Sequence, residues 1–369
     1  MKILIISQHI FPRQTPRAHR TTELIKEFAK QGHEVTVYAV LGEYNYEVFE
    51  KTHNVSINNI SIKTQLTPYT SDDTSTRSLV DKISGKLFGK LLEFPNIEFL
   101  YAIPKIIKKE ENIDLLISIA DPHHIHWGCA KSKLKNPTTF PKMWTADCGD
   151  PFMENGHTTS HFKCFAKYEK LFSGLCDYIT VPHEGAIEGY YPEFRNKIKI
   201  IPQGFSFDLL EENKVFVENK VVTFAYAGMF LKDIRNPNLF LDYISSINID
   251  FKFIVYTPYS ELILPYKKRL GEKLEIREVV GRKELLEVLK GVDFLLNVEN
   301  LNSPTAIPSK LIDYSISGRP ILSINPENIN KSNVDSFLKR DYSNKLVIQN
   351  LERFHISNVV KKFTKLSEA

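Results

Sequence analysis

The stretch of the sequence with the clearest chemical potential is 302–322, where a loop of small residues leads into a helical pattern. Ser309 follows Pro308 and is a natural N-cap, and the free backbone N–H groups behind a cap bind anions. Lys310 adds a positive charge, and Asp313 lies one helical turn further on. Since a carboxylate can accept hydrogen bonds from two hydroxyls, this set of residues could hold a phosphate and a ribose.

A second set of candidate residues follows the apolar strand pattern that ends at Gly228. Lys232 and Arg235 are the cations of this segment, and Asn236 comes directly after them. Arginine suits forked contacts with phosphate oxygens. The alternative interpretation is that Arg235 only flanks the start of a helix at Asn236-Pro237.

The first half of the chain offers a different set. Arg13, Arg17 and Arg20 lie in one short stretch, where they form either a solvated basic helix face or a phosphate contact. Asp147 and Asp150 follow a buried strand pattern. Aspartates there either cap the next helix or orient an attacking hydroxyl group.

Histidines and cysteines supply a metal hypothesis. His157, His161 and Cys164 have the spacing that places three side chains on one helix face, and Cys148 could complete a zinc site. No pair of cysteines has CxxC spacing, so zinc is not predicted. His123, His124 and His126 are interpreted first as structural residues.

The absence of two phosphate-binding motifs narrows the class of enzyme. The loop after the first strand pattern, SQHIFPR, contains no glycine, and GxGxxG occurs nowhere in the chain. This argues against a nicotinamide or flavin enzyme of the usual dinucleotide type. GxxxxGK[ST] is also absent, which argues against a P-loop nucleotidase.

Composition fits a globular protein of two domains. The chain has 369 residues, of which 42% are hydrophobic and 25% charged, and its 24 Phe and 16 Tyr exclude general disorder. The net charge of +4 and the pI of about 8.6 are too mild for a typical nucleic-acid binder. The sequence contains no apolar run long enough to predict a membrane span or a secretory leader. We expect the cysteines to be free thiols and the protein to be cytoplasmic.

The elements that must position these residues alternate between strand and helix. Helical patterns follow the first strand and occupy 283–290, 309–317 and about 350–365. Strands are predicted at 2–7, 34–39, 114–119, 142–146, 177–181, 198–201, 221–228, 251–256, 274–277, 294–298 and 320–323. This order predicts an α/β fold with two doubly wound, Rossmann-like domains whose strand ends face a cleft. The predicted parts are a first domain at 1–204, a linker at 205–220, a second domain at 221–349 and a helix at 350–369 that packs back on the first domain.

The sequence IPSKLIDYSISGRPIL resembles the donor-site signature of retaining GT-B glycosyltransferases of glycosyltransferase family 4. Asp313, Gly318 and Pro320 match its acidic residue, glycine and proline. The family usually has Glu at the Asp313 position, where it binds the ribose, and a first Glu eight positions earlier that contacts the sugar. Thr305 stands at that earlier position, and Glu299 is the nearest acidic residue before it.

A second match is YAGMFLKDIRN, in which Met229 replaces the usual Arg and Arg235 replaces the usual Lys of the diphosphate site. Segments of the first half, including GHEVTVYA, WTADCGDPF and IKIIPQG, resemble the acceptor domain of a polysaccharide-building branch of the same family. The resemblance covers roughly residues 1–350.

The resemblance implies transfer of a sugar with retention from a nucleotide sugar, most simply a UDP sugar, to a saccharide or lipid-linked saccharide in capsule or O-antigen synthesis. It implies no metal and no other cofactor. The alternatives are a GT-B-like nucleotide-sugar epimerase and a non-catalytic nucleotide-sugar-binding subunit. The implied site residues are, for catalysis, Arg235, Lys310 and Asp150; for the donor, Gly228, Lys232, Asn236, Glu299, Pro304, Thr305, Ser309, Leu311 and Asp313; and for the acceptor, Arg13, Arg17, His19, Asp147 and His126.

One further segment, 82–92, mixes lysines with Leu, Ile and Phe. It is either an interfacial helix that docks on anionic lipid or an ordinary packing helix. The first interpretation predicts a peripheral location at the inner face of the cell membrane. No nucleic-acid partner is expected.

Overall fold

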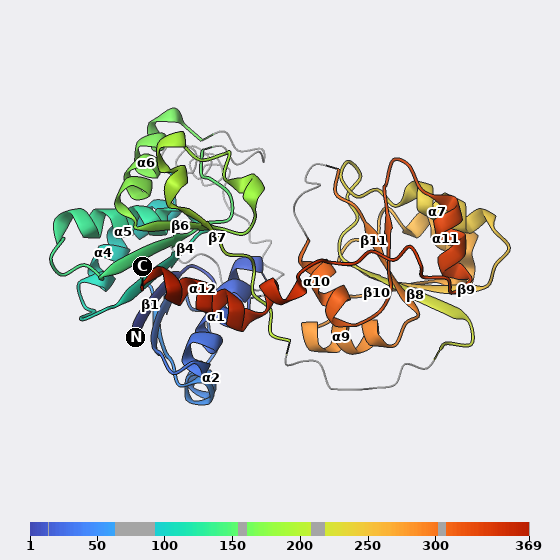
Figure 1. Ribbon diagram of the computed structural model, residues 1–369, viewed down its shortest axis with the longest axis horizontal. Coiled ribbons are helices and arrows are strands. Elements are labelled where there is room, and N and C mark those ends of the chain that lie inside the picture. The colour runs from blue at the N-terminus through green and yellow to red at the C-terminus, as the bar shows by residue number, and fades with distance from the viewer. Residues whose placement is uncertain (14, 63–92, 154–160, 208–217, 302–307, 369) are drawn as a thin grey trace, which may run out of the picture. The chain divides into compact units, whose positions relative to one another are not determined.

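The computed structural model describes residues 1–13, 15–62, 93–153, 161–207, 218–301 and 308–368. Two compact units make up the chain. The first contains Met1–Phe205 together with Phe354–Ala369, and the second contains Ser206–Arg353 (Figure 1). The chain therefore leaves the first unit once and returns to it at its end.

The described residues of the first unit form a seven-stranded parallel sheet in the order β3-β2-β1-β4-β5-β6-β7. Its strands are β1 (Lys2–Ser7), β2 (Glu34–Ala39), β3 (Ser56–Asn59), β4 (Leu115–Ile119), β5 (Met143–Asp147), β6 (Tyr178–Val181) and β7 (Ile198–Ile200). The continuous apolar runs of β1 and β4 fit a sheet that is covered on both faces.

Helices cover the two faces of this sheet. They are α1 (Pro16–Lys30), α2 (Glu47–His53), α4 (Phe99–Ile107), α5 (His124–Lys135), α6 (Ala166–Leu175) and α12 (Ile356–Leu366). Ile3 and Ile5 of β1 pack with α1, α2 and α12, whereas Leu4 and Ile6 pack with α4, α5 and α6. This division follows from the period of two along a strand. Figure 1 shows α12 lying beside α1, and the two helices are in contact.

The second unit repeats the architecture on a smaller scale. Its described strands form a parallel sheet in the order β10-β9-β8-β11-β12. They are β8 (Val222–Ala227), β9 (Phe251–Tyr256), β10 (Leu274–Arg277), β11 (Phe294–Val298) and β12 (Ile321–Ile324). The helices are α7 (Asn238–Ser246), α8 (Leu264–Leu270), α9 (Arg282–Lys290), α10 (Ser309–Ile316) and α11 (Lys331–Leu338). Phe224 packs toward α7, α8 and α11, and Ala225 packs toward α9 and α10.

The predicted fold class is confirmed, because two parallel sheets are each flanked by helices. Predicted element limits differ from the observed ones by a few residues, most of all for the last helix, which begins at Ile356. Strand β3 was not predicted. The segment 82–92, the zinc candidate His157 and part of the predicted linker 205–220 lie outside the described residues. None of the described helices is long and apolar enough to span a membrane.

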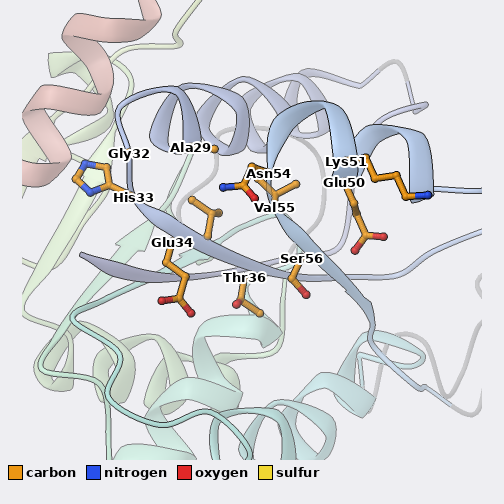
Figure 2. A pocket seen from close by; sticks show the side chains of 11 residues that line it. Ala29, Gly32, His33, Glu34, Thr36, Glu50, Lys51, Asn54, Val55 and Ser56 are labelled. Atoms are coloured by element: carbon orange, nitrogen blue, oxygen red, sulfur yellow. The ribbon is translucent and has the colours of Figure 1, made fainter.

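A groove of about 630 Å³ lies on the first unit where β2 and β3 begin. Figure 2 shows, among the residues that line it, Glu34 and Thr36 of β2, Ser56 of β3, and Glu50 and Lys51 of α2. Since parallel sheets of this kind bind their ligands at the carboxyl ends of the strands, this groove lies at the opposite end from the expected site.

Candidate functional site

The candidate donor site lies where the strand order of the second sheet reverses. β8 is followed by β9 on one side and β11 by β12 on the other, so the connections after β8 and β11 run in opposite directions. Parallel sheets bind ligands beyond the carboxyl ends of their strands at such a reversal of strand order. Gly228 follows β8, and Glu299 follows β11. The segments singled out from the sequence therefore meet at one edge of this sheet.

Gly228 requires glycine because of its backbone conformation. Its φ of +140° is one that residues with a Cβ rarely adopt. Its N–H donates to the carbonyl of Tyr256 on the neighbouring strand at 2.9 Å. The chain then folds back on itself, since the N–H of Arg235 donates to the carbonyl of Leu231 at 2.8 Å. This turn brings the Arg235 guanidinium back toward the end of β8.

Lys310 of α10 has a buried side-chain amine with a lowered pKa. Among the described residues, its buried Nζ atom has no hydrogen-bond partner, and it lies 4.4 Å from the centroid of the Tyr226 ring. Burial, and secondarily the charge of Arg235, lowers the pKa of Lys310 to about 7. The Nε atom of Arg235 is likewise buried with no hydrogen-bond partner in the described part of the chain. Two neighbouring basic side chains with such buried nitrogen atoms make a site that an anion would stabilise.

Tyr314 holds α10 against the end of β8. Its hydroxyl oxygen accepts a hydrogen bond from the Ala227 N–H at 2.7 Å, and the residue is fully buried. The start of α10 differs from the prediction: Pro308 occupies the N-cap, Ser309 is the first helical residue, and no side chain caps the helix. Ser309 is therefore not a capping residue, because the extended backbone conformation that marks the cap falls on Pro308.

Asp313 is tied to a residue that the sequence patterns did not single out. Arg282 donates to its Oδ1 through Nε at 2.9 Å, and Nη2 of the same arginine lies 2.8 Å from this oxygen. Asp313 follows Lys310 by three positions, so the two side chains share one face of α10. No local sequence signal marks Arg282, since it begins α9, far from Asp313 in the chain.

The remaining donor candidates are placed as follows. Lys232 is exposed, and Glu299 accepts a hydrogen bond from the Ser323 hydroxyl at 2.9 Å. The Asn236 side chain accepts from the Asn238 N–H at 3.0 Å, which is a local turn contact. Leu311 is buried in the core between α10 and the sheet. Pro304 and Thr305 lie outside the described residues.

In the first unit, a cavity of about 290 Å³ lies beyond the carboxyl ends of β4 and β5, the end of a parallel sheet at which ligands bind. Its charged and polar lining includes Arg17, Asp121, Asp150, Glu93 and His161. Burial raises the pKa of Asp121 even though Arg17 opposes the shift. The size and polarity of this cavity suit a single sugar ring.

Arg17 crosses Gly149 closely, because a Cβ atom at Gly149 would lie 1.9 Å from the arginine Nη2. The more buried Arg20 takes the carboxylate of Asp147, with Nη2 to Oδ1 at 2.7 Å. Thr180 also donates to Asp147, at 2.6 Å. Arg17 lies 3.7 Å from the same carboxylate and is partly exposed, so it is the arginine that remains available to the cavity.

Two acceptor predictions require correction. Asp147 is fully buried and already engaged by Arg20, so it stabilises the end of β5 rather than contacting an acceptor. His126 is also fully buried, with Nδ1 2.8 Å from the Ser118 hydroxyl and Nε2 3.3 Å from the Cys148 sulfur. Both residues occupy the core because their elements are covered on this side by neighbouring helices.

The acceptor candidates Arg13 and His19 lie before and on α1, and the catalytic candidate Asp150 follows β5. Arg13 contacts His9 at 2.7 Å, and burial together with this charge lowers the pKa of His9 to about 4. His19 is half-buried on α1. Asp150 is exposed at the rim of the cavity, and its carbonyl accepts a hydrogen bond from His123 at 3.0 Å.

Three of the four zinc candidates drawn from the sequence lie among the described residues. His161 lies 2.8 Å from Glu93, Cys164 is exposed and Cys148 is buried. The structure groups His123, His126 and Cys148 instead, each buried and with donor atoms within 4.8 Å of one another. Burial lowers the pKa of both histidines and raises that of the thiol. This group is therefore uncharged within an aromatic core.

No protein-family model matches this chain, and no curated protein sequence matches it. Several solved structures match it. A glycosyltransferase from Rickettsia africae has a TM-score of 0.67 at 12% identity, covering 100% of this chain and 97% of that one. The lipopolysaccharide outer core galactosyltransferase WaaB has a TM-score of 0.60 at 14% identity, covering 99% of each chain. Anabaena HepE in complex with UDP and glucose has a TM-score of 0.61 at 9% identity, covering 100% of each chain.

The chain has the fold of GT-B glycosyltransferases. Both parallel sheets take part in the likeness, since the matches span the whole length of each chain. A Listeria monocytogenes protein described as a UDP-N-acetylglucosamine 2-epimerase is also similar, with a TM-score of 0.52 at 11% identity, covering 99% of this chain and 95% of that one. The GT-B fold alone therefore does not choose between sugar transfer and epimerisation.

Proposed function

We propose that this protein transfers a sugar from a nucleotide-sugar donor, a UDP sugar, to a saccharide or lipid-linked saccharide acceptor, with retention at the anomeric carbon. The observation that carries the proposal is the buried amine of Lys310, which has no hydrogen-bond partner within the described ranges and is close enough to Arg235 to feel its charge. Asp313 lies one helical turn further along the same face of α10. A rise of about 4.5 Å over three helical residues matches the step from a phosphate to a ribose.

The proposed roles of these residues follow from the position at which negative charge develops during sugar transfer. Loss of the nucleotide gives an oxocarbenium-like transition state and places negative charge on the departing diphosphate. Lys310, Arg235 and the backbone N–H groups at the start of α10 are fixed before the reaction, so they stabilise that charge without reorganising. These groups can act without a divalent ion, and we propose a metal-independent enzyme.

The acceptor is proposed to bind the cavity of the first unit. Arg17 and Asp150 are the residues of this cavity that can contact a sugar and orient its attacking hydroxyl. WaaB is described as acting on the lipopolysaccharide outer core, and that description supports a surface polysaccharide, a capsule or O-antigen, as the product class here.

A peripheral location at the inner face of the cell membrane fits one surface of the first unit. Tyr101 is 59% exposed on α4 and Leu134 is 58% exposed on α5, with Lys131 3.9 Å from the centroid of the Tyr101 ring. Lys105 on α4 and Lys135 on α5 are exposed on the same two helices. Lysines around exposed apolar side chains favour an anionic lipid surface.

Calorimetry with UDP and UDP sugars, followed by product analysis, tests the proposal. Transfer to an added saccharide, with UDP released, is the expected result. Isomerisation of a UDP sugar without any acceptor would establish the epimerase instead. Binding of UDP without turnover on any acceptor would establish a binding subunit, and no binding of any nucleotide would refute all three.

A further inference from the structure

Three side chains that can ligate a metal meet in the first unit and have no part in the proposed transfer. His123 lines the 290 Å³ cavity, and His126 and Cys148 are buried behind it. Nε2 of His126 lies 3.3 Å from the Cys148 sulfur, and the donor atoms of all three residues lie within 4.8 Å of one another. Bonds of about 2.0 Å to nitrogen and about 2.3 Å to sulfur would set two ligand atoms about 3.5–3.7 Å apart. The group therefore fits one ion after a small rotation of His123.

Hydrogen bonds orient both imidazoles so that each keeps a lone pair for the ion. Nε2 of His123 donates to the Asp150 carbonyl at 3.0 Å, and its Nδ1 is buried with no hydrogen-bond partner in the described part of the chain. Nδ1 of His126 lies 2.8 Å from the Ser118 hydroxyl, which leaves Nε2 for the ion. Metal-ligating histidines are oriented in this way, because a partner on the other ring nitrogen fixes the tautomer. Burial lowers the pKa of both histidines, so the rings are neutral, as ligands must be.

The Tyr190 hydroxyl adds a donor for the sulfur. It is buried with no hydrogen-bond partner among the residues that the structure describes. It also opposes the rise in the pKa of the Cys148 thiol that burial causes, so it lies near the sulfur. A thiolate that forms on metal binding would accept a charge-assisted hydrogen bond from this hydroxyl. An unpartnered ring nitrogen and an unpartnered hydroxyl therefore converge on one buried group.

The surroundings of the group favour a soft, monovalent ion. Phe152 and Phe172 pack against the rings of His123 and His126 within an aromatic core. One thiolate and two neutral imidazoles bind Cu(I) with no net charge, whereas Zn(II) would leave one positive charge in that core, where charge is costly. Thiolate ligands also select Cu(I) because both partners are soft.

We infer that His123, His126 and Cys148 form a buried binding site for Cu(I). Binding forms one Cu–S bond and two Cu–N bonds, the thiol proton leaves to water, and the copper stays in its oxidation state. All three residues belong to the first unit. The inference therefore goes beyond the proposed function and does not depend on it.

Anaerobic titration of the full chain with Cu(I), against a coloured Cu(I) chelator, measures both the stoichiometry and the affinity. The wild-type protein should bind one Cu(I) tightly. Cys148→Ser and His123→Phe should each weaken binding more than about 100-fold, since changes to residues that only orient a ligand already cost about 10–100-fold. Phenylalanine keeps the ring contact with Phe152, so the fold should survive.

Cys129→Ser and Cys164→Ser are the matched controls, because Cys129 is buried in the same core and Cys164 is exposed. Both folded controls should keep the tightly bound ion. Four results overturn the inference: no tight binding by the wild-type protein, unchanged affinity in folded Cys148→Ser, loss of the ion in a folded control, or tighter binding of Zn(II) than of Cu(I). If Cys148→Ser does not fold, His123→Phe decides, because unchanged affinity in that variant also overturns the inference. None of these results bears on nucleotide binding or sugar transfer.

Discussion

Replacing Lys310 by methionine should stabilise the free protein and abolish nucleotide binding. Burial lowers the pKa of this amine from 10.5 to about 7. Each pKa unit corresponds to about 1.4 kcal/mol, so at neutral pH the buried amine costs the folded state about 4 kcal/mol. Methionine has a similar length and no charge, and we expect Lys310→Met to gain about 2–4 kcal/mol in the free energy of unfolding.

The sign of the pH dependence follows from the same pKa values. Between pH 7 and 10.5 the unfolded chain binds more protons at Lys310 than the folded chain does. The free energy by which Lys310 destabilises the folded state therefore falls as the pH rises. The gain from Lys310→Met should therefore be largest below pH 7 and nearly vanish toward pH 10.5. Urea unfolding at pH 6.5 and pH 9.5 makes this comparison.

Far-UV circular dichroism is the right probe for these unfolding curves, because both tryptophans, Trp127 and Trp144, are buried in the first unit. Lys283→Met is the matched control, since Lys283 is exposed on α9. It should change neither stability nor UDP affinity. A Lys310→Met protein that is no more stable than the wild type, or that binds UDP as tightly, would show that the amine is not an unpaired cation awaiting an anion.

Four other outcomes are expected. Asp313→Asn should weaken UDP binding by about 1–3 kcal/mol, the weight of a charged hydrogen bond, and unchanged affinity in calorimetry would remove Asp313 from the site. Arg17→Ala and Asp150→Asn should lower the transfer rate while UDP affinity stays nearly intact; a parallel loss of nucleotide binding would contradict the proposed division between the units. EDTA should leave the initial rate within about twofold, and a rate that collapses and returns with magnesium would refute metal-independent stabilisation of the leaving group. Lys105→Glu should reduce co-sedimentation with vesicles rich in anionic lipid and not with neutral ones; equal binding of the mutant would exclude α4 from the membrane contact.

The sequence was sufficient to predict the fold class, which the two parallel sheets confirm, whereas the donor site that it indicates along the chain stays a prediction. Alternating strand and helix patterns predict parallel sheets, and parallel sheets bind their ligands at the carboxyl ends of their strands. Gly228 was identifiable because the resembled family ends this strand with glycine, and the structure adds that its φ is +140°. Lys310 and Asp313 were identifiable because a spacing of three residues places both on one face of a helix.

The tertiary structure decided which of those residues carry an uncompensated charge. Asp147 has the sequence context of a site residue, yet Arg20 from α1 reaches it and closes it off. Lys310 and Lys232 were equivalent as lysines in a pattern, but Lys232 is exposed, whereas Lys310 is buried with no hydrogen-bond partner among the residues that the structure describes. Arg282 gave no signal at all, because its contact with Asp313 joins two helices that are distant in the chain. Local spacing determines which face of an element a side chain occupies, whereas burial and ion pairing depend on segments that only the folded chain brings together.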